Sequence, residues 1–291
     1  MGQPTILVTN DDGINSRGIW AVVQAVMSLG KVVVVAPDRQ WSGSGRSMPS
    51  SVTCEVREVA CRNRELDVQA YAVDANPAQT VMLGVLDLCG KRPDLVVSGV
   101  NHGFNLGTDV TLSGTVGAAL EAAAFGIPAL AASLEMDLRC YFDGDQNADY
   151  GGTMHFVRAL ARYILSIGLP RGVDILNLNL PSNTSATTPW YLTRLSRSRY
   201  FLPQPSSPED RRRLVGWSVL EDASGLDPQT DIYTLLTRRA VSITPLTIDM
   251  TAAAPAGREA EMGQDLARYL GEEDSPLSER RTNGRTQDKA Q

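Results

Sequence analysis

Short apolar runs alternate with amphipathic segments from the start of the chain to residue 181, and this pattern constrains the fold more than any other feature. The runs are rich in valine, leucine and isoleucine and end in polar residues or proline, which is typical of buried parallel strands. Between them, apolar residues recur every three or four positions, which indicates helices with one buried face. Strands are expected over residues 5–8, 31–36, 53–59, 66–73, 94–97, 128–133 and 173–177, and helices over residues 19–27, 77–88, 115–125 and 154–167.

Strands that alternate with helices predict an α/β fold, in which a mostly parallel sheet is covered by helices on both faces. Such a sheet binds ligands beyond the carboxyl ends of its strands. Polar clusters that directly follow predicted strands are therefore the first candidates for a functional site.

The sequence changes character after Pro181. Short strand-like runs at residues 191–195, 214–220 and 232–236 predict a β-hairpin extension and not a further strand–helix unit. An aromatic-rich arm of this kind can cover a partner subunit or pack on its own chain, and the sequence is consistent with both. The aromatic residues of this region are Trp190, Tyr191, Tyr200, Phe201, Trp217 and Tyr233.

The end of the chain contains one more candidate helix and a polar tail. Met262, Leu266, Tyr269 and Leu270 have the spacing of a helix face. From Glu272 onward the chain has almost no apolar residues, which predicts a disordered tail.

The charge balance excludes some classes of protein. The formal net charge is −6, from 27 Lys and Arg against 33 Asp and Glu. This balance disfavours binding of a nucleic-acid duplex, which needs a basic surface, although one local site can still bind a small phosphorylated molecule. No apolar run reaches the ~18 to 20 residues of a membrane-spanning helix, and the first residues do not resemble a signal peptide. We therefore expect a cytoplasmic protein without a membrane partner.

Four cysteines and two histidines limit the metal sites that the chain can build. No two cysteines form a C-x-x-C pair, which disfavours a zinc site of cysteine and histidine. Reduced, structural thiols are expected, and a metal would be held by oxygen atoms. The cysteines are Cys54, Cys61, Cys89 and Cys140.

The first polar cluster is Asn10-Asp11-Asp12-Gly13, directly after the first predicted strand. Two adjacent carboxylates repel each other in a partly dry pocket, and a divalent cation is the usual means of keeping both ionised. The same residues also favour a simple turn with a helix cap. Both interpretations stay open for this cluster taken alone.

The second cluster is Ser42-Gly43-Ser44-Gly45, with Arg39 and Arg46 nearby. Hydroxyls and bare backbone amides can bind an anion, and a hydroxyl can add an oxygen ligand to a metal. A flexible connection is the alternative interpretation. Neither the dinucleotide-binding nor the P-loop glycine pattern is present.

Two further clusters follow the strand expected at residues 94–97. Asn101 offers a carbonyl oxygen to a cation or an amide N–H to a phosphate, and His102 is a candidate acid or base, or a hydrogen-bonded structural histidine. Ser113-Gly114-Thr115 opens a predicted helix and can bind an anion or serve as an ordinary N-cap. Together, the clusters predict a divalent cation beside a phosphate, and hence hydrolysis of a phosphoester.

Four segments resemble the SurE family of stationary-phase survival proteins, which are metal-dependent 5′/3′-nucleotidases acting on nucleoside monophosphates. These segments are ILVTNDDGINSRGI, VVVVAPDRQWSGSG, PDLVVSGVNHGFNLGTDVTLSGTVGAALEAAAFGIPALAAS and VSITPLTIDMTA. The resemblance runs from about residue 6 to residue 251. It implies one Mg²⁺ or Mn²⁺ per subunit, with Asp11 or Asp12 as the catalytic base. The implied metal ligands are Asp11, Asp12, Ser42 and Asn101, and the implied phosphate contacts are Asn10, Asn105, Ser113, Gly114 and Thr115.

The resemblance also implies an architecture. The family has a Rossmann-like core, a β-hairpin arm and a C-terminal oligomerisation segment exchanged between subunits of a dimer or tetramer. On this basis we divide the chain into a catalytic core at residues 1–188, an arm and subunit-contact region at 189–250, and a C-terminal helix with a disordered tail at 251–291.

The sequence departs from the family pattern near the expected pocket. Ala75, Asn76 and Gln79 lie where the family usually has Gly-Thr-Pro-x-Asp, and His102 replaces a small residue. These departures, with Trp41 beside Ser42, bear on selectivity for the base or ribose.

Two other functions fit parts of the pattern: a phospho-acceptor receiver module and an inactive nucleotide sensor. A receiver needs a third aspartate at the end of a central strand and a later lysine, where this chain has Ser98-Gly99 and Ser133. Steady turnover of AMP with Mn²⁺ would distinguish the enzyme from the sensor.

Overall fold

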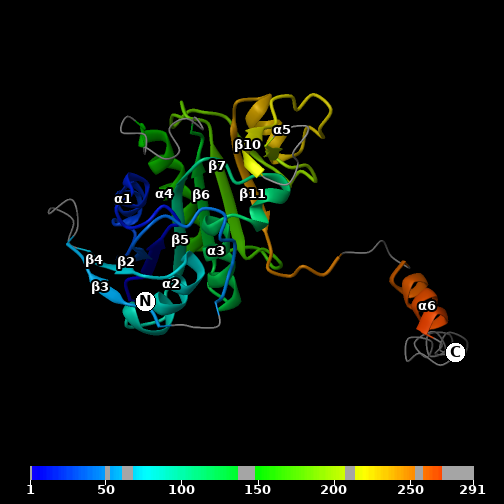
Figure 1. Ribbon diagram of the computed structural model, residues 1–291. Helices are drawn as coiled ribbons and strands as arrows, with labels where there is room; N and C mark the ends of the chain where they lie inside the picture. Colours follow the sequence, from blue (N-terminus) through cyan, green and yellow to red (C-terminus); the bar gives the residue numbers. More distant parts are fainter. Residues whose placement is uncertain are drawn as a thin grey trace, which may run out of the picture. The chain divides into compact units, whose positions relative to one another are not determined.

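The computed structural model describes residues 2–49, 53–60, 68–136, 148–206, 214–252 and 258–270. It divides into one unit that ends at Ile248 and a second that begins at Asp249. The first unit holds the sheet and the clusters identified in the sequence (Figure 1). Within the described ranges, no helix has the length and apolar character needed to cross a membrane.

A nine-stranded sheet in the order β3-β4-β2-β1-β5-β6-β7-β11-β8 forms the centre of the first unit. The strands from β4 to β7 in this order pair in parallel. Strand β3 runs antiparallel to its neighbour β4, and β11 runs antiparallel to its neighbour β7. The mostly parallel sheet expected from the sequence is therefore confirmed. The strands are β1 (Thr5–Thr9), β2 (Lys31–Pro37), β3 (Val56–Glu58), β4 (Gln69–Val73), β5 (Leu95–His102), β6 (Ala129–Leu134), β7 (Ile175–Leu180), β8 (Trp190–Leu192) and β11 (Val241–Leu246).

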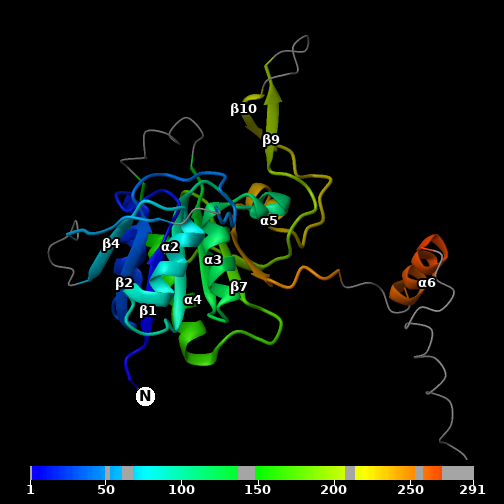
Figure 2. The same ribbon diagram turned by 60° about the horizontal axis from the view of Figure 1, so that its bottom comes forward.

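Helices cover both faces of this sheet, as predicted (Figures 1 and 2). On one face, α1 (Arg17–Val26) and α4 (Gly151–Ile167) pack on each other and bury the side chains of Ile6 and Val8. On the other face, α2 (Pro77–Leu83) and α3 (Gly114–Ala124) pack together over Leu7. Successive residues of β1 thus enter opposite cores, which explains why the strand is an unbroken apolar run and not an alternating one. Short π- and 3₁₀-helical turns follow at Gly84–Leu88 (η1) and Gly107–Thr111 (η2).

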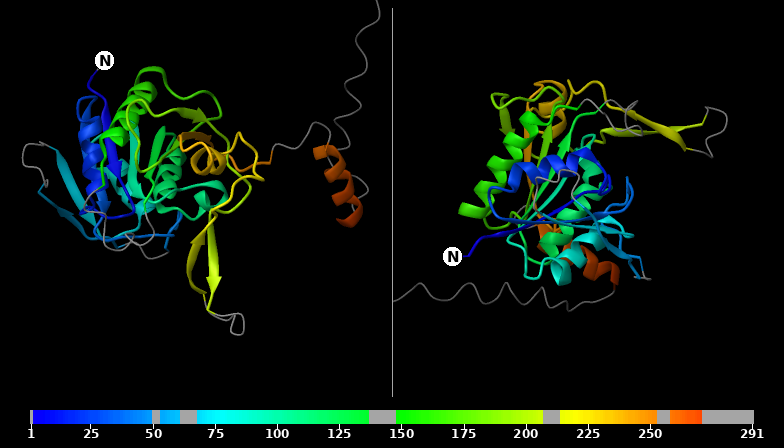
Figure 3. Two further views of the ribbon diagram at one scale, coloured as in Figure 1. Left: turned by 90° about the horizontal axis from the view of Figure 1, so that it is seen from above. Right: turned by 90° about the vertical axis from the view of Figure 1, so that its left-hand side faces the viewer.

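The β-hairpin arm is formed by β9 (Phe201–Pro205) and β10 (Leu214–Val219), an antiparallel pair outside the main sheet. Figure 3 shows it projecting from the rest of the first unit. The run expected at residues 191–195 is different, because β8 pairs in parallel with β11 at the edge of the main sheet. The sheet therefore continues beyond residue 188, and the first compact unit extends to Ile248.

One predicted strand was wrong. Residues 232–236 lie in a helix, α5 (Asp231–Leu236), whose buried Ile232 and Leu235 are three positions apart on one face. A short apolar run has no periodicity that separates a strand from a buried helical turn.

The second unit contains the predicted C-terminal helix, α6 (Arg258–Leu270). Met262, Leu266 and Tyr269 are exposed on it. The side chain of Leu270 and the tail after it lie outside the described residues. Of the four cysteines, Cys54 and Cys89 are free thiols, and Cys61 and Cys140 lie outside the described ranges.

Helix α1 lies so close to the end of β5 that only glycine fits at residue 18. A Cβ on Gly18 would lie 2.2 Å from the carbonyl oxygen of Val100. Alanine in a helix is normally more stable than glycine by up to ~1 kcal/mol. We expect the opposite sign here: Gly18→Ala should destabilise the fold by about 1–3 kcal/mol, measured by urea unfolding, because α1 must move away from β5.

Gly151→Ala in α4 is the matched control. The nearest atoms that a Cβ at Gly151 would meet, among the residues the structure describes, belong to the exposed side chain of Asp149, the closest at 3.2 Å, and this side chain can move aside. Its effect should be small, and a Gly18→Ala protein as stable as wild type would contradict the close approach.

Candidate active site

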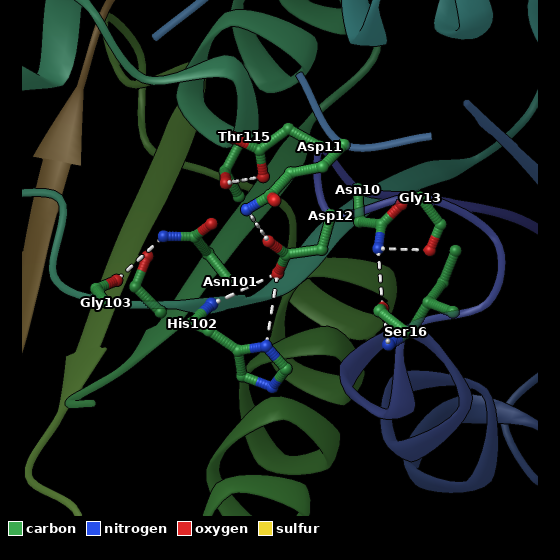
Figure 4. A network of polar contacts seen from close by, with 12 residues as sticks. Asn10, Asp11, Asp12, Gly13, Ser16, Asn101, His102, Gly103 and Thr115 are labelled. Atoms are coloured by element: carbon green, nitrogen blue, oxygen red, sulfur yellow. Dashed lines mark hydrogen bonds and ion pairs between the residues drawn. The ribbon is translucent and has the colours of Figure 1, made fainter. Parts of the chain in front are cut away.

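The polar clusters that follow β1, β2 and β5 meet at the carboxyl edge of three neighbouring strands. Asp11 and Asp12 follow β1, Ser42 lies beyond β2, and Asn101 and His102 end β5. Figure 4 shows the residues of the first and third clusters gathered around the two aspartates. The structure thus brings the polar clusters of the sequence analysis to one edge of the sheet.

Asp11 is held by the start of α3. Its Oδ1 accepts a hydrogen bond from the hydroxyl of Thr115 at 2.6 Å, and only 5% of the residue is exposed. A Cβ on Gly114 would lie 2.9 Å from the other carboxylate oxygen. Thr115 fixes the carboxylate of Asp11, and the missing side chain of Gly114 leaves space for this carboxylate.

Asp12 is held by the end of β5 and by the loop after β2. Its Oδ2 accepts from the backbone N–H of His102 at 3.2 Å, and its Oδ1 accepts from the side-chain amide of Gln40 at 3.4 Å. The Nδ1 of His102 lies 3.6 Å from Oδ2, and its Nε2 lies 2.5 Å from the hydroxyl of Tyr150. The imidazole therefore bridges Asp12 and the start of α4.

Burial raises the pKa of both carboxyl groups above the usual value for aspartate. For Asp11, the negative charge of Asp12 raises the pKa further, while the hydrogen bond from Thr115 opposes the rise. For Asp12, the bonds from His102 and Gln40 oppose it. Because the two adjacent carboxyl groups resist ionising together, a cation bound between them would stabilise their ionised form.

The serine–glycine loop is attached directly to Asp11 and α3. The backbone N–H of Trp41 donates to the carbonyl of Asp11 at 2.7 Å, and that of Gly45 donates to Leu112 at 2.9 Å. A Cβ on Gly117 of α3 would lie 2.2 Å from the carbonyl oxygen of Gly45. The loop is thus packed onto the site and is not a free connection, and Ser42 lies at the cavity beside Asp11.

Asn101 reaches the site because β5 is irregular just before it. The pairing of β5 with β6 shifts register between Ser98 and Asn101, which redirects the side chains that follow. The amide nitrogen of Asn101 donates to the carbonyl of Gly103 at 2.8 Å. In Figure 4 the amide oxygen lies on the side that faces the two aspartates, where it can serve as a ligand.

Asn105 is fixed by a buried amide network from β6 and β7. Its backbone N–H donates to Oδ1 of Asn179 at 2.8 Å, and its carbonyl accepts from the amides of Asn177 and Asn179, both at 3.0 Å. Its own side-chain amide donates to Ser133 at 2.8 Å. Both ends of the peptide unit and the side chain are therefore held, and Asn105 lines the cavity.

The other residues implied as phosphate contacts have structural partners. Ser113 is the N-cap of α3 and accepts from the N–H of Val116 at 3.1 Å, yet it still lines the cavity. The amide nitrogen of Asn10 donates to the carbonyl of Gly13 and to the hydroxyl of Ser16. Asn10 and Thr115 are fully buried and lie outside the lining of the cavity, so each acts on the site by positioning a neighbour.

A cavity of about 660 Å³ opens beside these residues. A volume of this size is typical of small-molecule sites. Its lining contains the polar residues Asp11, Gln40, Ser42, Asn101, His102, Asn105, Asp109 and Ser113, and the apolar residues Phe104, Leu112, Phe201 and Trp217.

The departures from the family pattern have different places in the structure. His102 lines the cavity, whereas Trp41 and residues 75–79 do not. Asn76 instead caps α2 in a capping box with Gln79 and donates to the carbonyl of Ser47 at 3.0 Å. Of these departures, His102 is the one placed to affect a ligand directly.

The sequence analysis did not identify Gln40, Tyr150 or the asparagines of β7 as parts of this region. Gln40 lies inside the quoted segment VVVVAPDRQWSGSG but was not singled out there, and Tyr150 lies outside every quoted segment. Asn177 and Asn179 did carry a signal, because they place polar amides at alternate positions of a fully buried strand. Buried amides need partners, so such a pair points to a hydrogen-bond network.

The chain is similar to known proteins of one family. The family described as survival protein SurE matches residues 6–201. The chain is 42% identical over 247 residues to the 5′-nucleotidase SurE of Thermococcus kodakarensis, covering 85% of this chain and 93% of that protein. It is 41% identical over 249 residues to the 5′-nucleotidase SurE of Archaeoglobus fulgidus, with the same coverage. The crystal structure of the SurE protein from Aquifex aeolicus is similar with a TM-score of 0.70 and 32% identity, covering 92% of this chain and all of that one.

The raised pKa of Asp11 predicts that the metal-free protein becomes less stable to unfolding as the pH rises. A carboxyl whose pKa is higher in the folded state than in the unfolded state lowers stability as pH rises from the unfolded value through the folded one. In EDTA, wild type should therefore lose stability between about pH 4 and pH 7 relative to Asp11→Asn. Above pH 7 the variant should be more stable by at least ~1 kcal/mol, measured by chemical denaturation. An equally stable variant across this range would contradict the buried, repelling pair.

Proposed function

The chain belongs to the SurE family, and we propose that it is a metal-dependent phosphomonoesterase that hydrolyses nucleoside 5′- and 3′-monophosphates to nucleoside and phosphate. The observation that carries this proposal is the Asp11–Asp12 pair, whose carboxylates are largely withdrawn from water, with neutral oxygen donors beside a cavity of nucleotide size. The names of the relatives support the 5′-nucleotidase activity. The metal requirement and the 3′ activity rest on the family resemblance and on the chemistry of the site.

The residues present suit a hard divalent cation. Asp11 and Asp12 supply carboxylates, Ser42 a hydroxyl and Asn101 an amide oxygen, an all-oxygen set that favours Mg²⁺ or Mn²⁺ over zinc. Among the residues the structure describes, no three His, Cys, Asp or Glu side chains gather as they would for a closed metal site. Two acids with neutral oxygens leave room for water and a phosphate, which is how Mg²⁺ is usually bound.

Two buried oxygen atoms near the site support this fit. The hydroxyl of Ser44 and Oδ1 of Asn10 are buried and have no hydrogen-bond partner within the described parts of the chain. The hydroxyl of Ser44 also lies 2.7 Å from the point that a Cβ on Gly114 would occupy, beside the Asp11 carboxylate. Gly114 thus leaves space beside the Asp11 carboxylate, and the buried hydroxyl of Ser44 lies next to that space.

When bound, the cation would supply a Lewis acid that polarises a phosphoryl oxygen and makes a water molecule more acidic. The chain supplies the remaining groups. Asp11 or Asp12 would accept the proton of the attacking water. The raised pKa values belong to the metal-free site, because a bound cation favours the ionised form of both carboxylates. Asn105 and Ser113, which line the cavity and are held in place before the substrate arrives, stabilise charge on the phosphate oxygens.

We further propose that the protein self-associates in the cytoplasm. Trp190 and Leu192 lie on the edge strand β8, with 59% and 68% of their surfaces exposed. Apolar side chains of that size on an unpaired strand edge favour cover by another subunit.

The proposal is tested by a panel of phosphate esters assayed with EDTA and with each divalent ion. We expect AMP to be hydrolysed with Mg²⁺ or Mn²⁺, EDTA to abolish turnover, and the added ion to restore it. Binding of AMP without turnover under every condition would indicate the nucleotide sensor instead.

Loss of a neutral ligand and loss of a charged ligand should have different effects on metal binding and on the rate. Asn101→Ala removes a neutral ligand, so it should weaken metal binding by at least about 10- to 100-fold, and excess Mn²⁺ should recover part of the rate. Asp11→Asn removes a charge that the metal and the water both need, so the same excess should recover little. Metal affinity is measured by calorimetry and the rate by phosphate release. If Asn101→Ala keeps wild-type metal affinity and loses only phosphate binding, Asn101 contacts the substrate and not the metal.

A further inference from the structure

The cavity has an apolar part that the phosphate chemistry does not use. Phe104, Leu112, Phe201 and Trp217 line it together with the polar residues. Leu112 and Trp217 keep 44% and 53% of their surfaces exposed, although large apolar side chains are usually buried. Exposed apolar surface that is continuous with a polar site indicates a ligand with an apolar portion.

The arm presents one apolar face to this cavity. In the pairing of β9 with β10, Phe201 lies opposite Val219 and Pro203 lies opposite Trp217. Side chains of opposite residues share a face, and alternate residues of a strand do so too, so these four project to the same side. Phe201 and Val219 pack against the apolar cluster around Phe104 and Tyr200, and Trp217 extends that face along the cavity.

The base of the arm is fixed to the loop that carries the polar site. The Oδ2 of Asp109 accepts from the backbone N–H groups of Tyr200 and Phe201 at 2.9 and 2.8 Å. The backbone N–H of Thr108 donates to the carbonyl of Ser198 at 3.1 Å. Asp109 and Thr108 belong to η2, which follows Asn105 and leads into α3. Phe201 and Trp217, the aromatic wall of the cavity, therefore lie on an arm whose base is fixed by hydrogen bonds to the loop at the phosphate end.

From these observations we infer that Phe201 and Trp217 form the seat of the nucleobase, and that they select purine nucleoside monophosphates by stacking. The inference rests on the proposed function, because the phosphate of the same ligand occupies the polar end. The polar side chains near the apolar part are already engaged: Asp109 by Tyr200 and Phe201, and Gln40 by Asp12. The base would therefore be recognised by stacking on its ring face and not by hydrogen bonds to its edge. A purine ring system has a larger face than a pyrimidine ring, so stacking favours purines.

The test compares substrates with and without a base. For Trp217→Ala, the ratio of kcat/KM for AMP to kcat/KM for ribose 5-phosphate should fall by about 5- to 150-fold, the usual effect of losing one base–aromatic stack. Trp217→Phe should retain most of the ratio, because it keeps an aromatic ring. Tyr163→Ala is the matched control: Tyr163 is also an exposed aromatic residue, on helix α4, but it does not line the cavity and should leave the ratio unchanged.

Binding of adenosine, measured by calorimetry in EDTA, provides a second measurement that needs neither metal nor turnover. Adenosine should bind wild type and Trp217→Phe more tightly than Trp217→Ala. If wild type hydrolyses no phosphate ester, the proposed function is wrong, and adenosine binding alone decides whether the base seat exists. If a folded Trp217→Ala protein keeps both the wild-type substrate ratio and the wild-type adenosine affinity, the base seat is overturned.

Discussion

Two carboxylates on consecutive residues are the constraint around which this site is organised. Asp11 and Asp12 are both withdrawn from water, and each alone would resist ionisation there. The chain compensates in part, with Thr115 on one acid and the N–H of His102 on the other. These donors orient the acids, but they do not cancel a charge of two. The charge that remains when both acids are ionised is what the divalent cation of the proposed function would offset.

The parallel sheet brings these groups together. Because β2, β1 and β5 are neighbours that run in one direction, residues far apart in the sequence end at the same edge. Small residues then allow the next layer to close over that edge: Gly114 leaves space for the Asp11 carboxylate, and Gly117 lets α3 lie against the serine–glycine loop. The site is therefore a property of close backbone packing as much as of its polar side chains.

Much of this could be predicted from the sequence, and the exceptions have physical reasons. The central strands were predictable because their unbroken apolar runs leave few alternatives, and the acid pair because consecutive aspartates after such a strand are conspicuous. Residues 232–236 were wrongly predicted as a strand because five apolar or neutral residues fit either structure. The roles of Asn177, Asn179 and Tyr150 could not be assigned because their partners are tens of residues away. The wall formed by Phe201 and Trp217 likewise depends on where the arm lies, which local pattern does not encode.

The carboxylate of Asp231 joins the last part of the first unit to the loop beside the phosphate end. It accepts from the backbone N–H of Gly107, a residue 124 positions earlier, and from that of Ser196. During synthesis, which proceeds from the N-terminus, the sheet strands up to β7 are complete long before this carboxylate leaves the ribosome. A nascent chain thus carries its acid pair early but gains a fixed Gly107 turn only after the 124 residues up to Asp231 have been added. The order of the elements along the chain makes completion of the pocket depend on residues that are synthesised after the parallel strands of the sheet.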